Sequence, residues 1–284
     1  MAESPLLTSL NPVQRDAVLQ TEGPVLIVAG AGSGKTRILT HRIAYLIREK
    51  EVHPKQILAI TFTNKAAQEM QERVQELLGT LLSRGMWILT FHSTCARILR
   101  REHQRLGLPS HFSIYDEADS ERVIKMVLRD AGLDERRFPP KAMKAAISKA
   151  KDNLLGATEF AEAAGNWYEN TVADVYRGYE ARLRSAGSVD FDDLILRTVQ
   201  LFRGQPEVLE HYQERFRYVL IDEYQDTNRA QYHLVNLLAS KHRNICVVGD
   251  ADQGIYSWRG ATIQNLLDFE HDYPDAQEFI LDQN

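Results

Sequence analysis

The sequence has few cysteines, no long apolar run and no surplus of positive charge. Its 284 residues include two cysteines, Cys95 and Cys246, which lie far apart in apolar segments. We expect reduced packing residues there rather than a disulfide or a metal site. No apolar stretch is long enough to span a membrane, and the N-terminus has no basic-then-apolar export signal. The default expectation is a cytoplasmic protein without a membrane segment.

The charge balance argues against a uniformly basic nucleic-acid binder. Lysine and arginine together number 34, against 39 aspartate and glutamate residues, which gives a formal net charge of −5. A local basic track remains compatible with nucleic acid, because binding depends on where the cations cluster. Two segments carry such clusters, and for each alone a solvated helix face is the favoured interpretation. They are Arg97, Arg100, Arg101 and Arg105, and Arg136, Arg137, Lys141, Lys144, Lys149 and Lys151.

A pattern near the N-terminus predicts a phosphate-binding loop between a buried strand and a helix. An apolar run over 25–29 leads into small residues and then into Gly34, Lys35 and Thr36. Backbone N–H groups of such a loop can hold phosphate oxygens, while the lysine reaches the β- and γ-phosphates and the threonine hydroxyl holds Mg²⁺. The general pattern has glycine where this chain has Ala29, and a glycine-rich turn without a ligand is the alternative. The predicted loop comprises Ala29, Gly30, Ala31, Gly32, Ser33, Gly34, Lys35 and Thr36.

Two adjacent carboxylates follow a second apolar run, over 218–221. Asp222 and Glu223 would be costly to bury there unless they meet a cation or water. We predict that Asp222 holds Mg²⁺ and that Glu223 polarises the attacking water. Acidic residues also end strands in ordinary turns, but the phosphate-binding loop in the same chain strengthens the hydrolytic interpretation.

A third strand, over 244–250, leads into residues suited to phosphate and to nucleic acid. Gln253 can hydrogen-bond a γ-phosphate or a water molecule. Trp258 and Arg259 offer a stacking face and a cation for a single strand. Core packing is the alternative for Tyr256 and Trp258, and their position after a strand end favours function.

Repeated strand–helix units predict an α/β fold with a parallel doubly wound sheet, whose ligands lie beyond the carboxyl ends of the strands. A further buried strand is predicted over 57–63, and Asn64 is predicted to cap the helix that follows it. Between 108 and 189 helical patterns dominate, with a mild break at Gly178, and strand signals nearly vanish. The predicted domains are an α/β domain formed by 1–108 and 190–284, and a mainly helical insertion over 109–189.

With these motifs assembled, the chain resembles the UvrD/PcrA/Rep family of superfamily-one DNA helicases, and within it most closely the PcrA group. The resemblance covers essentially the whole chain, and its motifs occur in the family's order. They are 10–14, the loop ending at Arg37, 61–67, 90–93, 190–194, 221–226 and 249–253. The family tolerates alanine at the position of Ala29. The resemblance implies a RecA-like P-loop NTPase domain that contains the helical insertion.

The resemblance also implies roles for individual residues. Gln14 would read adenine, and Arg37 would lie against the nucleotide. Without the resemblance, an ordinary surface glutamine is the more common interpretation of Gln14. Lys35, Asp222 and Glu223 keep the roles derived above, and Gln253 would couple the γ-phosphate to DNA. The residues that would line the path of the DNA strand are Phe62, Thr63, Asn64, His92, Phe191, Tyr256, Trp258 and Arg259.

The implied activity is ATP- and Mg²⁺-dependent unwinding of DNA, with 3′-to-5′ translocation along a single strand, in repair or replication. The implied partners are single-stranded DNA, junctions of duplex with single strand, and repair or replication proteins. Family helicases carry a second RecA-like domain, and this chain ends where its first motif is expected. We therefore expect a portion of a longer protein, with weak or no ATPase activity by itself. The alternatives are a nucleotide- and DNA-binding module without turnover, and the helicase part of a helicase-nuclease.

Overall fold

The computed structural model describes residues 4–30, 34–250 and 264–281. Its contacts divide the chain into two compact units. The sheet unit comprises 1–94, 206–227 and 235–284, and the helical unit comprises 95–205 and 228–234. The helical unit is therefore wider than the predicted insertion over 109–189.

The sheet unit contains a parallel sheet, which confirms the predicted α/β fold. In the described part of the chain its strand order is β3-β2-β6-β7-β1-β8, and all neighbours run parallel. The inner strands are continuous apolar runs, as expected for strands covered on both faces. The strands are β1 (Val25–Ala29), β2 (Ile57–Thr61), β3 (Trp87–Thr90), β6 (Tyr218–Ile221), β7 (Ile245–Gly249) and β8 (Gln277–Leu281).

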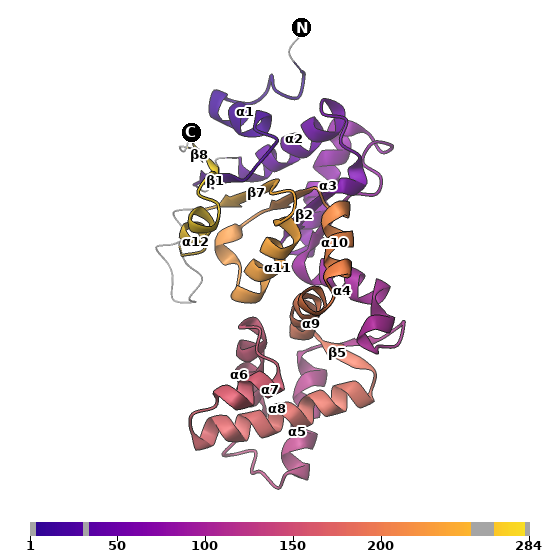
Figure 1. The fold of residues 1–284 in the computed structure, drawn as a ribbon, viewed down its shortest axis with the longest axis vertical. Coiled ribbons are helices and arrows are strands. Elements are labelled where there is room, and N and C mark those ends of the chain that lie inside the picture. The colour runs from indigo at the N-terminus through magenta and orange to yellow at the C-terminus, as the bar shows by residue number, and fades with distance from the viewer. Residues whose placement is uncertain (1–3, 31–33, 251–263, 282–284) are drawn as a thin grey trace. The chain divides into compact units, whose positions relative to one another are not determined.

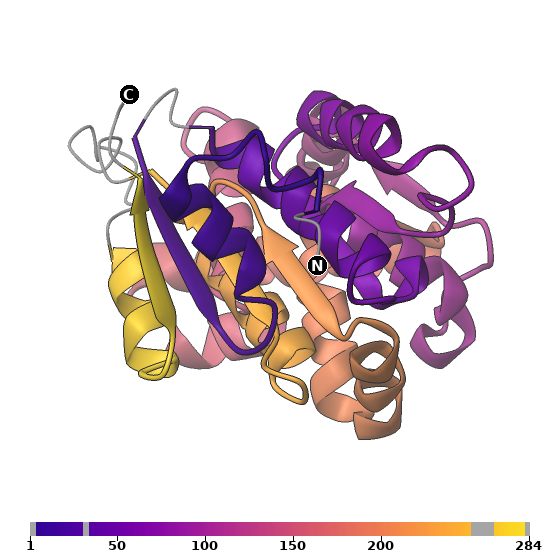
Figure 2. The ribbon, with the colours of Figure 1, turned by 90° about the horizontal axis from the view of Figure 1, so that it is seen from above.

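Helices pack on both faces of this sheet (Figures 1 and 2). Val25 and Ile27 of β1 join a buried core with apolar residues of α1, α2 and α3, whereas Leu26, which points to the opposite face, is not part of that core. The helix α12 lies on the other side of the sheet (Figure 1). The helical segments of the sheet unit are α1 (Pro12–Leu19), α2 (Lys35–Arg48), η1 (Pro54–Gln56), α3 (Asn64–Leu78), α10 (Pro206–Arg215), η3 (Tyr224–Asp226) and α12 (Gln264–Asp272), together with the part of α11 (Arg229–Ala239) from 235 onward.

The helix α3 begins one residue earlier than predicted. Thr63 is its N-cap, in an extended conformation, and the Thr63 hydroxyl accepts a hydrogen bond from the backbone N–H of Ala66. Asn64 is therefore the first helical residue and not the cap, so that prediction was wrong. Threonine and asparagine both cap helices well, and the pattern alone did not separate two such neighbours.

The helical unit has its own apolar core, built from α5, α6 and α8. It also contains a short parallel pair, β4 with β5, which the sequence analysis missed because three-residue strands carry too little alternation to detect. Its elements are η2 (His103–Leu106), β4 (Ser113–Tyr115), α5 (Glu117–Asp130), α6 (Pro140–Asp152), α7 (Ala157–Ala163), α8 (Trp167–Ser185), β5 (Ser188–Asp190) and α9 (Phe191–Gly204), together with most of α4 (Phe91–Arg101).

The predicted break at Gly178 does not occur, because α8 runs through it without interruption. A Cβ atom at this position would lie 2.7 Å from Cγ1 of Val127 on α5. Glycine therefore serves the close approach of two helices rather than a bend.

Both cysteines are free and buried thiols, as predicted. Burial raises the pKa of the Cys95 thiol to about 12, so this group stays protonated and acts as packing. Within the described ranges, no helix is both long enough and apolar enough to cross a membrane.

Candidate functional site

The carboxyl ends of three adjacent strands bring the predicted hydrolytic residues together. β7 lies between β6 and β1 in the sheet, and all three run parallel. Asp222 and Glu223 follow β6, Asp250 follows β7, and Lys35 opens the helix after β1. Ligands of open α/β sheets bind at this kind of edge. The strand order thus joins segments that are almost two hundred residues apart along the chain.

Lys35 is the cation at the centre of this edge. Its Nζ lies 2.8 Å from Oδ2 of Asp250 and 3.6 Å from Oε2 of Glu223. Burial lowers the pKa of Lys35, but the hydrogen bond to Asp250 and the negative charges of Glu223, Asp250 and Asp222 outweigh it, so the net shift is upward. The ammonium group therefore stays charged at neutral pH, as a phosphate-binding lysine must.

Asp222 is a carboxylate in a buried place. It is 6% exposed and accepts a hydrogen bond of 3.1 Å from the backbone N–H of Glu223. Burial, and then the neighbouring charge of Glu223, raise the pKa of Asp222 to about 6. A cation at this position would remove the cost of ionising it.

The residues at this edge of the sheet fit a site in which Mg²⁺ is bound together with phosphate. Within the described ranges, no group of three or more histidine, cysteine or acidic residues is arranged to hold a metal. Mg²⁺ at a phosphate site takes only one or two protein carboxylates and completes its shell with phosphate oxygens and water. Asp222 and the hydroxyl of Thr36, in the first turn of α2, would be its protein ligands.

Glu223 has an unusual backbone conformation for a residue with a side chain. Its φ of 51° and ψ of 44° lie in the left-handed region, which costs about 1–2 kcal/mol. The Glu223 carboxylate is held by Gln225, whose Nε2 donates to Oε2 of Glu223 at 2.7 Å. Oε1 of the same Gln225 accepts from the backbone N–H of Asp250 at 3.0 Å.

Gln225 and Asp250 had no predicted role. Asp250 carried the same signal as Asp222, an acidic residue directly after a buried strand, and could have been found by it. Gln225 could not be found this way, because its two contacts join β6 and β7 segments whose adjacency appears only in the folded sheet.

Gln14 lies beside Gly34, the residue just before Lys35 in the predicted phosphate-binding loop. Its Oε1 accepts from the backbone N–H of Asn11 at 3.1 Å, and the Asn11 side chain in turn caps α1. Its Nε2 points at Gly34 and lies 3.1 Å from where a Cβ atom of that residue would stand. Gly34 has a φ of 88°, which favours glycine, and a side chain at this position would also crowd Gln14. The predicted adenine reader therefore borders the loop.

Three side chains of α2 hold the N-terminal segment in place by donating to its carbonyl groups. Arg37 donates to the carbonyl of Ser9 at 2.9 Å, and the buried Arg42 donates to that of Ala17 at 2.7 Å. The ring nitrogen Nδ1 of His41 lies 2.7 Å from the carbonyl of Leu6. The helix that follows the loop thus positions α1, which carries Gln14. Contact of Arg37 with a nucleotide stays a prediction.

Several of the predicted DNA contacts lie at the ends of the neighbouring strands β2 and β3. Phe62 packs edge-on against Phe91, with ring centroids 5.4 Å apart. Asn64 is exposed and helps to line a pocket of about 450 Å³ between α3 and β3. His92 lies in the first turn of α4, whereas the side chain of Thr63 is engaged as the α3 cap. Phe191, which is 49% exposed, belongs to the helical unit.

Seven predicted site residues fall in the segments that the structure does not describe. They are Ala31, Gly32, Ser33, Gln253, Tyr256, Trp258 and Arg259. Their roles stay predictions from the sequence.

The raised pKa of Asp222 predicts how stability depends on pH in the absence of nucleotide and metal. Because the folded-state pKa of about 6 exceeds the ordinary 3.8, the folded protein binds this proton more tightly than the unfolded chain. The free energy of unfolding should therefore fall as pH rises from about 4 to about 6. Asp222→Asn should raise the unfolding free energy at pH 7.5 by about 1–3 kcal/mol and remove that pH dependence.

Thermal unfolding at pH 5 and pH 7.5 without Mg²⁺ checks this expectation. Asp174→Asn, which removes an exposed carboxylate on α8, is the control and should leave the pH profile unchanged. An Asp222→Asn protein that is less stable than wild type at pH 7.5 would contradict the account.

Comparison with known proteins agrees with this arrangement. Residues 10–274 match the model of the UvrD/REP helicase N-terminal domain. The chain is 56% identical over 279 residues to a protein of Bacillus subtilis (strain 168) named ATP-dependent DNA helicase PcrA. Proteins of that name from Staphylococcus aureus (strain Mu50) and Staphylococcus epidermidis are 54% and 53% identical over the same length.

These alignments cover 98% of this chain and 38% of each relative. The chain thus spans well under half the length of the curated relatives that it matches. The family match, by contrast, extends over nearly all of the chain and includes Lys35, Asp222, Glu223 and Asp250. The chain therefore belongs to the UvrD/REP helicase N-terminal domain family.

Proposed function

We propose that this chain is the ATP- and DNA-binding motor portion of an ATP-dependent DNA helicase that translocates 3′ to 5′ along single-stranded DNA. The observation that carries the proposal is the meeting of Lys35, Glu223 and Asp250 at the carboxyl ends of three neighbouring parallel strands, with Asp222 beside Glu223. The family membership and the names of the relatives support the same function. The proposed pathway is DNA repair or replication in the cytoplasm, with proteins of that pathway as partners.

In this proposal each residue of the site has a defined task. The ammonium group of Lys35 exchanges Asp250 for phosphate oxygens of ATP and neutralises charge that develops on them. Glu223, oriented by Gln225, accepts a hydrogen bond from the attacking water and takes its proton. Thr36 and Asp222 would hold Mg²⁺, which would supply a positive charge near the β- and γ-phosphates. Gln14 borders the loop and hydrogen-bonds the adenine edge.

The path of the DNA strand is proposed to start at Phe62 and Asn64, after β2, and to continue past His92, after β3. Aromatic side chains suit bases of any identity, because every base has a stacking face. Gln253, next along the chain after β7, is proposed to couple the γ-phosphate to this path, and Tyr256, Trp258 and Arg259 to extend it.

We further propose that the chain alone hydrolyses ATP slowly. Arginines that a second motor domain directs at the γ-phosphate are worth roughly 10³–10⁵ in rate. The cation that this chain directs at the phosphates is Lys35, and in this structure its Nζ is paired with Asp250 and Glu223.

Binding and turnover by the 284-residue chain test the proposal. We expect Mg²⁺-dependent binding of a fluorescent ATP analogue, binding of a labelled single-stranded oligonucleotide, and slow hydrolysis with or without DNA. Absence of nucleotide binding would contradict the ATP site. Fast, DNA-stimulated hydrolysis by the chain alone would contradict the requirement for a second domain.

A further inference from the structure

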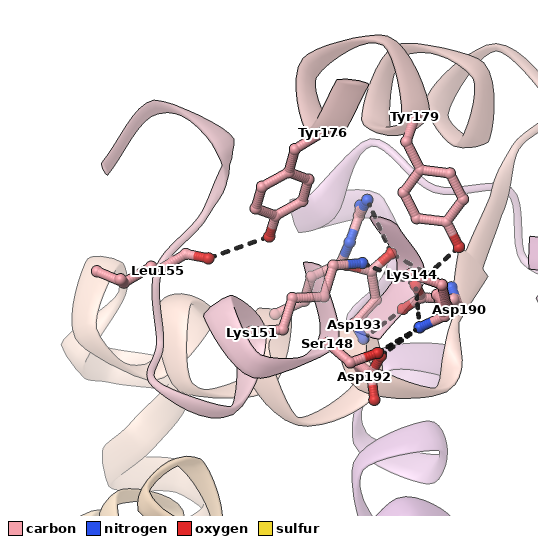
Figure 3. A network of polar contacts seen from close by, with 10 residues as sticks. Lys144, Ser148, Lys151, Leu155, Tyr176, Tyr179, Asp190, Asp192 and Asp193 are labelled. Atoms are coloured by element: carbon pink, nitrogen blue, oxygen red, sulfur yellow. Dashed lines mark hydrogen bonds and ion pairs between the residues drawn. The ribbon is translucent and has the colours of Figure 1, made fainter. Parts of the chain in front are cut away.

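The helix α6 carries two lysines that do not lie on a solvated face. Both belong to a network of ion pairs in the helical unit, at the start of α9 (Figure 3). The side chain of Lys151 is fully buried and that of Lys144 is 13% exposed, so the interpretation of this basic cluster as a solvated helix face was wrong for these two residues. Their partners are three aspartates within the run 190–193, which contains Phe191.

Lys151 holds the first and last aspartates of this run. Its Nζ lies 2.9 Å from Oδ2 of Asp190 and 2.9 Å from Oδ1 of Asp193. Tyr179 of α8 also donates to Oδ2 of Asp190, at 2.8 Å. Asp190 caps α9 through its other oxygen, which accepts from the backbone N–H of Asp193. These charged groups can remain buried because each lies beside a group of opposite charge.

Lys144 holds the aspartate on the other side of Phe191. Its Nζ lies 2.5 Å from Oδ2 of Asp192 and 3.5 Å from Oδ2 of Asp190. Ser148, one turn further along α6, donates to the same oxygen of Asp192 at 2.6 Å. Thus both residues next to Phe191 in the sequence are attached to α6 (Figure 3).

Phe191 itself remains half exposed, although its neighbours are fixed. It is the first residue of α9 and lines a pocket of about 280 Å³ together with Lys141, Lys144 and Tyr115. An aromatic ring that stacks on a base gains affinity only if its orientation is set before binding, since ordering it on binding costs free energy.

We propose that Lys144 and Asp192 are positioning residues for single-strand binding, which orient Phe191 through the 190–193 turn and do not contact the DNA. This rests on the single-strand binding proposed above and on the prediction from the sequence that Phe191 lines the path of the strand, where it would stack on a base. Lys144 already has Asp192 as its ionic partner and adds no free positive charge to the DNA path. Lys151 forms the buried anchor of the same turn and would be too costly to remove for a functional test.

The test measures the affinity of the 284-residue chain for a fluorescent oligothymidylate over a series of salt concentrations. The variants are Lys144→Met, Asp192→Ala, Phe191→Ala and the two doubles with Phe191→Ala. Lys149→Met is the control, because Lys149 is an exposed lysine of the same helix. Thermal unfolding verifies that every variant is folded at the assay temperature.

Phe191→Ala should weaken binding by roughly 5- to 150-fold, the range for loss of one stacked base. Lys144→Met and Asp192→Ala should each weaken it by at least about fivefold, although they change the net charge in opposite directions. Neither should weaken binding further in the Phe191→Ala background, and the salt dependence should not change. Lys149→Met should stay within about twofold of wild type.

Three results would overturn the proposal. One is stronger binding by Asp192→Ala, which would indicate simple electrostatic attraction. Another is additive losses in the doubles, and the third is a salt slope reduced by about 0.7 in Lys144→Met, as expected for one lost phosphate contact to a single strand. If the wild type binds no oligonucleotide, or if Phe191→Ala binds as tightly as wild type, the DNA role proposed in the previous section fails and this inference fails with it.

Discussion

Replacing Glu223 with glutamine is expected to lower ATP turnover by about 10²- to 10⁴-fold and to leave ATP affinity almost unchanged. The reason is that an amide cannot take the proton of the attacking water, whereas it occupies the same space. The glutamine carbonyl can still accept the hydrogen bond that Gln225 donates at 2.7 Å, so the local structure should persist. Turnover is measured in a protein that joins this chain to a second motor domain, and affinity is measured with a non-hydrolysable analogue.

Glu214→Gln is the matched control for this change. It removes the same charge from an exposed side chain of α10, which precedes the amino end of β6 and pairs with Lys241. It should keep full turnover. If Glu223→Gln retained more than about a tenth of wild-type turnover, Glu223 would not be the residue that activates water.

Replacing Lys35 with methionine is expected to weaken ATP binding by about 30- to 5,000-fold, the equivalent of about 2–5 kcal/mol for truncating one partner of a buried charged pair. Methionine keeps the length of the apolar stem, so the loss is chiefly that of the ammonium group. In the nucleotide-free protein the same change removes the cation that lies 2.8 Å from Asp250. Equilibrium titration of the 284-residue chain with a fluorescent ATP analogue measures the effect.

Lys50→Met is the control for charge loss, because Lys50 is an exposed lysine just beyond the end of α2. It should bind the analogue like wild type. Binding by Lys35→Met within about threefold of wild type would show that Lys35 does not contact the phosphates.

The sequence alone predicted the parts of the site that are continuous in the chain. The loop before Lys35 and the acidic pair at Asp222 each combine an apolar strand with the residues that directly follow it, and this pattern is readable without a structure. Their proximity also followed, because parallel strands present their carboxyl ends at one edge.

The missed features depend on contacts between distant segments. Gln225 joins Glu223 to the backbone of Asp250, and Lys144 neutralises an aspartate 48 residues away. A basic residue on a helical pattern looks the same whether it faces water or a buried carboxylate. Only the packing of α6 against the start of α9 distinguishes these cases.

The fold was predictable to a similar degree. The apolar strands predicted at 25–29, 218–221 and 244–250 correspond to β1, β6 and β7, whereas the three-residue strands β4 and β5 were not predicted. Gly178 was misjudged because its low helix propensity suggests a break, and the contact with Val127 that requires a glycine there is tertiary.

The most direct test of the central claim is ATP hydrolysis with and without single-stranded DNA, compared between this chain and a protein that joins it to a second motor domain. We expect slow hydrolysis by the chain alone. The longer protein should hydrolyse ATP faster with DNA, and its Glu223→Gln variant should lose this activity. A longer protein that binds ATP and single-stranded DNA but never hydrolyses ATP faster with DNA would contradict the motor assignment and favour a binding module without turnover.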